Sequence, residues 1–295
     1  MKEIVLITGG RGSLAGKLNV LLSKNYEVRF LTTKKEPDFK NHFYWNINES
    51  YVSKNALTGI KHIIHLSGFN ISNRWTKKNK ILMYQSRVDA SKLLLKKCEE
   101  LQIKPKTFIT ASAIGYYNNK KNIKTETSIP GKDWISNLCI DWEQAAENFL
   151  KLGSRVIKLR FPLILDKDSG ILKRILLGFK LNTGLIFGNG TQSFPWIDIK
   201  DASRFIHFAI EDEKITGVYN CLCSDNSSFS DFIQEIKNTK YKHALIIYIP
   251  KKLIEIFFGE QTRIILSDIQ VSNSKIMQTD FKFDTNNMSD FLAKI

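Results

Sequence analysis

The sequence contains little cysteine and no long apolar run, and both shortages exclude classes of protein. Its four cysteines, Cys98, Cys139, Cys221 and Cys223, form neither a C-x-x-C pair nor a Cys/His cluster at zinc-binding spacing. We therefore expect reduced structural thiols and no metal site. No apolar stretch approaches the roughly 18 residues of a transmembrane helix. The first residues, MKEIVLITGG, lead straight into glycines without a cleavage site, which favours a cytoplasmic protein.

Acidic residues are also scarce, because 29 Asp and Glu stand against 44 Lys and Arg, a formal net charge of +15. Such an excess is typical of nucleic-acid binders. Only nine of the basic residues are arginine, however, and the lysines are dispersed in short pairs such as Lys34-Lys35 and Lys77-Lys78. A general drift in composition explains this pattern. We expect no nucleic-acid and no membrane partner, and a basic nucleic-acid binder is kept as the second alternative function.

Hydrophobic residues make up 43% of the chain, enough to bury a large core. Short apolar runs predict strands at residues 3–8, 26–32, 43–46, 61–67, 106–112 and 155–160. Apolar residues at helical spacing predict helices at 13–24, 75–101, 134–152 and 200–210. This alternation predicts an α/β fold, a doubly wound parallel sheet of the Rossmann type. In the longest helix, we expect Ile81, Tyr84, Val88, Leu95 and Cys98 to share the apolar face.

A glycine-rich turn joins the first strand to the first helix, and it consists of Gly9, Gly10, Arg11, Gly12, Ser13, Leu14 and Ala15. In a dinucleotide-binding turn, Gly9 permits the tight bend and Gly12 lets the backbone approach a pyrophosphate. Ala15, with Gly16 behind it, lets the helix pack closely on the strand. The helix N-terminus then offers free N–H groups to the phosphates. The alternative is a turn that only connects strand to helix; its place between strand and helix favours a dinucleotide site.

The end of the second strand bears on the type of cofactor. NAD-binding proteins usually carry an acidic residue there, about 20 residues after the turn, to hold the ribose hydroxyls. Here that place holds Thr32, Thr33, Lys34 and Lys35. With two cations and no carboxylate, a 2′-phosphate is stabilised, so we expect NADP, with NAD possible. The alternative is a solvated lysine pair after a strand.

The alternation of strands and helices ends after Phe161, where GFKLNTGLIFGNGTQSFPWID carries four glycines and a proline. We expect residues 1–165 to form an NAD(P)-binding Rossmann-type domain, its sheet completed by segments near 195–225. We expect residues 166–295 to form a smaller mixed lobe on the substrate side, with a C-terminal extension.

Seven motifs in order give the chain a family resemblance: ITGGRGSLAG, HLSGFNISNRW, SRVDASKLL, ITASAIGYY, LCIDWEQAAE, RVIKLRFPLIL and FPWIDIKDASRF. With them the chain resembles the atypical short-chain dehydrogenases of the NAD-dependent epimerase/dehydratase-like family, which have a short C-terminal extra domain. The resemblance implies an extended Rossmann-type fold. It also implies that Leu66, Ser67, Gly68, Arg87 and Arg160 lie on the cofactor side.

The resemblance also shows a departure in the catalytic residues. Active members of the superfamily use a Tyr-x-x-x-Lys dyad on the helix after the fifth strand. The corresponding positions hold Ile135 and Cys139 here, and Cys139 is expected to be a core thiol. The remaining candidate catalytic residues are Ser112, Tyr116 and Tyr117, although the two tyrosines can equally serve for packing. Asp198 stands where the family typically has a histidine.

Three functions follow from these features. The first is an NADP-dependent oxidoreductase or epimerase that acts on a small carbonyl or sugar-like substrate, which the aromatic lobe around Phe187, Phe194 and Trp196 favours. The second is a non-catalytic NADP-binding or redox-sensing protein, which the missing dyad favours. The third is the basic nucleic-acid binder.

Overall fold

A computed structural model describes residues 2–37, 39–119 and 122–295 of the chain. The chain divides into two compact units. Unit 1 comprises Met1–Tyr116, Asp133–Arg160 and Ser203–Tyr219, and unit 2 comprises Tyr117–Lys132, Phe161–Ala202 and Asn220–Ile295. Both units are thus assembled from segments that alternate along the sequence. Across the described ranges, no helix is long and apolar enough to cross a membrane.

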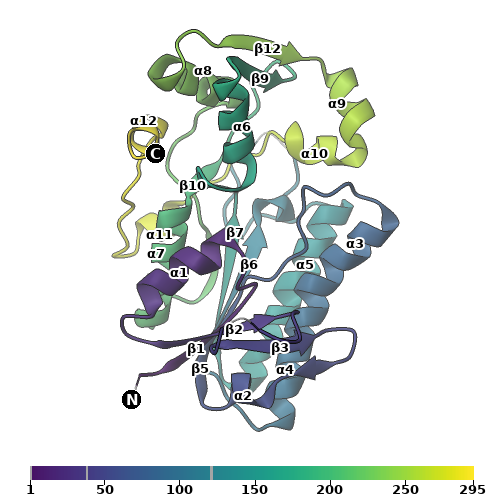
Figure 1. Cartoon of the computed structure of the whole chain (residues 1–295), viewed down its shortest axis with the longest axis vertical. Coiled ribbons are helices and arrows are strands. Elements are labelled where there is room, and N and C mark those ends of the chain that lie inside the picture. The colour runs from purple at the N-terminus through teal and green to yellow at the C-terminus, as the bar shows by residue number, and fades with distance from the viewer. Residues whose placement is uncertain (1, 38, 120–121) are drawn as a thin grey trace. The chain divides into compact units, whose positions relative to one another are not determined.

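Unit 1 is built on an eight-stranded sheet with the order β11-β7-β6-β5-β1-β2-β3-β4 (Figure 1). The strands are β1 (Ile4–Thr8), β2 (Glu27–Thr32), β3 (His42–Asn46), β4 (Tyr51–Val52), β5 (Ile60–His65), β6 (Thr107–Ala113), β7 (Arg155–Phe161) and β11 (Gly217–Asn220). The pairs from β6 through β5, β1 and β2 to β3 are parallel, and the short β4 is antiparallel to its neighbour β3. The chain runs outward from β1 in both directions, which confirms the doubly wound Rossmann-type fold.

Helices cover both faces of this sheet (Figure 1). They are α1 (Ser13–Leu22), α2 (Lys54–Leu57), α3 (Lys77–Tyr84), α4 (Ala90–Glu100), α5 (Trp134–Glu147) and α7 (Ile199–Glu211). A core of buried apolar side chains lies between the strands and α4 and α5, and it includes Leu6, Ile63, Leu94, Phe108 and Phe149. Apart from the short α2, which was not predicted, these helices lie where the apolar periodicity predicts them, because each must bury one face against the sheet.

The long helix expected over residues 75–101 is interrupted by a π-turn, Gln85–Asp89, between α3 and α4. A π-turn holds one more residue than an α-turn, so the residues before and after it do not keep a common helical phase. Val88 and Cys98 are buried as expected, but Ile81 is 56% exposed. The prediction that Ile81 shares this face was therefore wrong, since it assumed an unbroken helix.

Unit 2 holds two small parallel sheets, one of β8 (Leu163–Leu165) with β10 (Trp196–Asp198) and one of β9 (Thr183–Phe187) with β12 (Leu245–Ile249). Its helices are α6 (Gly170–Lys180), α8 (Phe229–Lys240), α9 (Lys251–Phe258), α10 (Thr262–Ile265), α11 (Ser274–Met277) and α12 (Met288–Ala293). Phe194 and Trp196 are buried in its core together with Phe179, Phe232 and Phe291. These two aromatic residues, expected beside a substrate, therefore hold unit 2 together.

Candidate functional site

The glycine turn at the end of β1 contains positions where only glycine fits. Gly9 has φ +73°, in the left-handed region, and a Cβ there would lie 2.9 Å from the carbonyl oxygen of Leu66. A Cβ on Gly10 would lie 2.8 Å from the Phe30 ring on β2. The turn is closed by a hydrogen bond of 2.8 Å from the Gly12 N–H to the Gly9 carbonyl. The backbone of the turn therefore packs closely against Phe30 on β2 and against Leu66, which follows β5. The next residues of the turn, 11–13, are exposed.

The start of α1 provides hydrogen-bond donors. Gly12 is its N-cap and, in the part of the chain that the structure describes, no side chain caps this helix. The N–H groups of Ser13 and Leu14 therefore belong to an N-terminus that carries partial positive charge, and no acidic residue lies in the first turn. Arg11 is exposed beside them. This arrangement suits a phosphate.

Of the two small residues at the start of α1, Ala15 and Gly16, only Ala15 lies on the buried face, which it shares with Leu18 and Leu22. Ala15 is buried, whereas Gly16 is exposed and a Cβ there would meet no atom within 4 Å. The expectation that Gly16 supports close packing was wrong, because its Cα lies on the solvent side of the helix.

At the end of β2, Thr32 is buried and Thr33, Lys34 and Lys35 are exposed. The Lys34 N–H donates to the Thr32 hydroxyl at 3.3 Å. The two lysine side chains therefore start from a strand end at the same sheet edge as the glycine turn, because β1 and β2 are parallel neighbours.

A buried histidine ties the ends of β1 and β5 together. The His65 Nε2 lies 3.0 Å from the Arg87 carbonyl oxygen, and since a carbonyl only accepts, Nε2 carries the proton. The Nδ1 then accepts from the Thr8 hydroxyl at 2.9 Å. That hydroxyl oxygen accepts in turn from the N–H groups of Leu66 and Ser67, at 3.0 Å each. The network fixes the chain that passes beneath Gly9.

Acid is expected to destabilise the fold through His65. Burial lowers the pKa of His65 from 6.5 to about 4, so the unfolded chain takes up a proton before the folded one. The free energy of unfolding therefore keeps its full value above pH 6.5. It decreases by about 3 kcal/mol as the pH falls towards 4. Urea unfolding of the wild type and His65→Gln across this range measures it, with the exposed His243→Gln as control. An unchanged pH profile in His65→Gln would refute this assignment.

Arg87 lies in the π-turn and is a half-buried cation. Its Nη1 donates to the carbonyls of Phe69 and Met83, at 3.0 and 3.2 Å, and its guanidinium lies over the Trp142 ring, 5.1 Å from the centroid. Burial lowers the pKa of Arg87 to about 10, which keeps it charged at neutral pH. Within the described ranges, it forms no ion pair. A Cβ on Gly68 would lie 2.8 Å from its Nη2, so a larger residue there would require the guanidinium to shift.

The structure thus brings together four of the residues expected on the cofactor side. Leu66 and Ser67 contact Gly9, and Gly68 adjoins Arg87. The Ser67 hydroxyl donates to the Ser86 carbonyl in the π-turn at 3.0 Å.

A second cluster joins β6, β7 and α5 around the carboxylate of Glu143. Arg160 donates from Nε and Nη2 to the two Glu143 oxygens, at 2.7 and 2.8 Å, and Ser112 donates its hydroxyl to Oε1 at 2.7 Å. The side chains of Arg160 and Glu143 are only 3% and 7% exposed. β6 and β7 are neighbours in the sheet, and α5 connects them in the chain, which is why the three side chains meet.

The two candidate tyrosines are placed differently. The ring of Tyr116 lies beneath the Arg160 guanidinium, whose carbon is 3.5 Å from the ring centroid. Tyr117 belongs to unit 2, where it is buried and donates its hydroxyl to the Asn220 side-chain oxygen. Only Tyr116 therefore joins Ser112 and Arg160 in one cluster.

Comparison with known proteins identifies the family. The model of the NAD dependent epimerase/dehydratase family matches residues 5–221. The chain belongs to this family. Epimerase family protein YfhF of Bacillus subtilis (strain 168) is 27% identical over 99% of this chain and 97% of its own length. Epimerase family protein ML0860 of Mycobacterium leprae (strain TN) is 30% identical over 74% of this chain and 71% of its own.

A solved structure extends the likeness to the whole chain. It is the human epimerase family protein SDR39U1 (isoform 2) with NADPH, which is 26% identical with a TM-score of 0.88. The match covers 99% of this chain and 98% of that one. The resemblance to atypical short-chain dehydrogenases that the motifs indicate is therefore confirmed.

The positions at which the superfamily resemblance leads us to expect a Tyr-x-x-x-Lys dyad hold Ile135 and Cys139. On α5, Ile135 packs against Gly115, where a Cβ would lie 3.1 Å from the Ile135 Cγ1. Cys139 is buried, and burial raises the pKa of its thiol to about 12. Neither side chain exchanges a proton at neutral pH, and the burial agrees with a core role for Cys139.

Asp198, at the family's histidine position, lies at the end of β10 in unit 2 and is buried. It accepts from the Lys200 N–H at 2.9 Å and from the Thr285 hydroxyl at 3.2 Å. These bonds join β10 to the C-terminal segment within unit 2.

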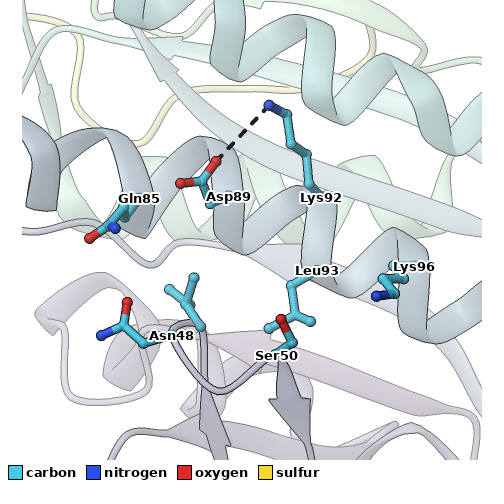
Figure 2. A pocket seen from close by; sticks show the side chains of 8 residues that line it. Asn48, Ser50, Gln85, Asp89, Lys92, Leu93 and Lys96 are labelled. Atoms are coloured by element: carbon cyan, nitrogen blue, oxygen red, sulfur yellow. Dashed lines mark ion pairs between the residues drawn. The ribbon is translucent and has the colours of Figure 1, made fainter.

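A pocket of about 440 Å³ in unit 1 is separate from these clusters (Figure 2). It lies between the loop after β3 and the start of α4, where Lys92 and Asp89 face each other at 4.0 Å. Its lining residues are Ile47, Asn48, Ser50, Gln85, Asp89, Lys92, Leu93 and Lys96. None of them is among the expected site residues, so we place the candidate site at the glycine turn.

Sequence reasoning missed Glu143, Thr8 and His65 as parts of the site. Glu143 left one usable signal in the epimerase family motif LCIDWEQAAE. It lies one helical turn after Cys139 and next to Trp142, on the face that α5 buries, and a buried carboxylate requires a partner. Thr8 and His65 end buried strands and left no comparable signal.

Proposed function

We propose that this chain binds NADP(H) and uses it to oxidise or reduce a small carbonyl or sugar-like substrate. The observation that carries the proposal is the turn at Gly9 and Gly10, where no Cβ fits, followed by the uncapped start of α1. The backbone from Gly10 to Leu14 would hold the pyrophosphate. When bound, the nicotinamide supplies or accepts a hydride. The NADPH in the structure of the human relative supports this choice of cofactor.

Lys34 and Lys35 are proposed to select NADP over NAD, because they extend from the end of β2 and residues 32–35 include no carboxylate. The variant Lys34→Glu/Lys35→Glu is expected to weaken NADPH binding about 100-fold and NADH binding only slightly, since two repulsive charges face a 2′-phosphate. Fluorescence titration with both nucleotides measures this. Lys77→Glu/Lys78→Glu, with the same change in net charge, is the control; equal losses for both nucleotides would contradict the assignment.

For the chemistry, we propose Tyr116 as the group that exchanges a proton with the substrate. The Arg160 guanidinium lies over its ring and fixes the ring in this cluster. Ser112 is buried and donates its hydroxyl to Glu143, the carboxylate that holds Arg160, which makes it a positioning residue. Arg160 is held in place by Glu143.

The test is NADPH oxidation with a panel of aldehydes, ketones and nucleotide sugars. Tyr116→Phe is expected to lower kcat by about 100-fold or more while NADPH affinity stays unchanged. Tyr117→Phe is the matched control, because that hydroxyl is bonded to Asn220 in unit 2. Equal activity of wild type and Tyr116→Phe would remove Tyr116 from the mechanism.

The second candidate function is NADP binding without catalysis, as a redox sensor or ligand-holding protein. Ile135 and the neutral thiol of Cys139 favour it, since they occupy the positions of the dyad. Tight NADPH binding without turnover of any substrate in the panel would establish it in place of the first. Binding of neither nucleotide would reject both.

A further inference from the structure

Unit 2 exposes an unusual concentration of large apolar side chains. Of the 20 that are exposed among the described residues, 11 lie in two segments, residues 170–187 and 241–266. The segments contain α6, β9, β12, α9 and α10, and we call their exposed side the basic apolar surface. Its apolar members are Leu177, Leu181, Leu185, Leu245, Ile247, Tyr248, Leu253, Ile256, Phe257, Phe258 and Ile264. Such a concentration marks an interaction site.

The sheet of β9 and β12 turns an apolar face outward. Ile247 pairs directly with Leu185 across the two strands, and both are exposed. The alternate residues Ile186 and Ile246 point into the core of unit 2. The sheet is therefore apolar on both faces, although only one face is covered.

The helix α9, which follows β12 in Figure 1, repeats this pattern. Leu253, Ile256 and Phe257 are spaced three and four residues apart and so form one stripe, 44%, 69% and 70% exposed. Ile254, on another side of the helix, is fully buried and anchors it. Because Ile254 anchors α9 in the core, the side chains of the stripe stay exposed to solvent.

The same segments are strongly basic. Their seven cationic residues are Lys173, Arg174, Lys180, Lys242, Lys251, Lys252 and Arg263, against the two acidic residues Glu255 and Glu260. A second copy of the chain would bring like charges together across a symmetric interface, which disfavours self-association. An anionic partner is complementary to this surface.

We propose that the basic apolar surface docks reversibly on an anionic lipid membrane. Leu253, Ile256 and Phe257 enter the headgroup region while the lysines meet lipid phosphates, as in interfacial amphipathic helices. A bilayer suits these side chains better than an acidic protein does, because they project from a helix rather than line a groove. The sequence pattern led us to expect no membrane partner, since these residues come from two separate segments of the chain and their exposure cannot be read from spacing.

Co-sedimentation of the full chain with lipid vesicles tests the proposal. We expect binding to vesicles of phosphatidylglycerol and phosphatidylcholine in equal parts, weakened by salt, and little binding to phosphatidylcholine alone. Ile256→Ser/Phe257→Ser is expected to weaken binding at least tenfold. Lys242→Gln and Lys252→Gln are expected to weaken it about fivefold each. Ile123→Ser/Ile129→Ser removes two exposed apolar side chains elsewhere in unit 2 and is the matched control.

Thermal unfolding shows whether each variant still folds, and NADPH binding is read separately, so failure of the proposed cofactor function does not affect this test. No binding by the wild type, equal binding to neutral vesicles, or an equal loss in the control variant would overturn the proposal. Dimers in solution that Ile256→Ser/Phe257→Ser dissociates would assign the surface to a second copy and overturn it as well.

Discussion

Gly9→Ala is expected to remove nearly all NADPH-dependent stabilisation of the fold. An alanine at φ +73° is strained, and its Cβ would lie 2.9 Å from a backbone oxygen of Leu66 that has little freedom to move. The turn must shift, and the N–H groups that face the pyrophosphate shift with it. Thermal unfolding with and without NADPH at 100 times the wild-type Kd gives about 2.7 kcal/mol for the wild type. A hundredfold weaker variant retains about 0.4 kcal/mol.

Gly16→Ala provides the matched control, since it adds the same methyl group to α1 where no atom lies within 4 Å. It is expected to bind NADPH like the wild type and to gain up to about 1 kcal/mol of stability from the higher helix propensity of alanine. If Gly9→Ala keeps the full NADPH-dependent shift, the turn is not the cofactor site.

Arg160→Met is expected to destabilise the protein by about 3–5 kcal/mol, because it leaves the Glu143 carboxylate buried without its cation. The Ser112 hydroxyl continues to donate to this carboxylate, but a single neutral donor does not replace a two-point ion pair. Urea unfolding measures the loss. The same variant loses the cation over Tyr116, so turnover, if present, falls with it.

The double variant Arg160→Met/Glu143→Leu separates the charge effect from the packing effect. It is expected to recover most of the lost stability, since neither charge is then buried. Lys97→Met breaks an exposed pair with Glu100 of similar length, 2.7 Å, and is expected to cost less than about 1 kcal/mol. Similar losses of stability in Arg160→Met and Lys97→Met would show that the buried ion pair contributes no more to the free energy of unfolding than the exposed one does.

The strands, the main helices and the glycine turn were predictable because they depend on short-range patterns. Ile4–Thr8 and Ile60–His65 are continuous apolar runs, as expected of strands covered on both faces. The turn at Gly9 is recognisable because its glycines stand directly between an apolar strand and an amphipathic helix. Leu66, Ser67 and Gly68 came together with it because parallel strands end at one edge of the sheet.

The rest depends on contacts between distant segments. The partnership of Glu143 with Arg160 and Ser112 needs three elements in register, and no spacing along the chain encodes it. Residues 117–132 belong to unit 2 and residues 203–219 belong to unit 1. The amino-acid composition does not change at the points where the chain passes from one unit to the other. The π-turn that exposes Ile81 likewise follows from where Arg87 must lie, rather than from the propensities of Gln85–Asp89.

The additional residue in that π-turn lets one continuous helical segment both bind the Arg87 guanidinium and pack α4 into the core, which a regular helix could not do at once. An α-helix advances by about 100° per residue, so fixing the direction of any side chain fixes all the others. The Met83 carbonyl, just before the insertion, and the Ser86 hydroxyl, within it, accept from the guanidinium beside Gly68. Downstream, Leu93 and Leu94 are rotated independently to fill the space under the sheet. Deleting one residue from the π-turn would therefore disrupt either the hydrogen bonds of the Arg87 guanidinium or the core packing of Leu93 and Leu94.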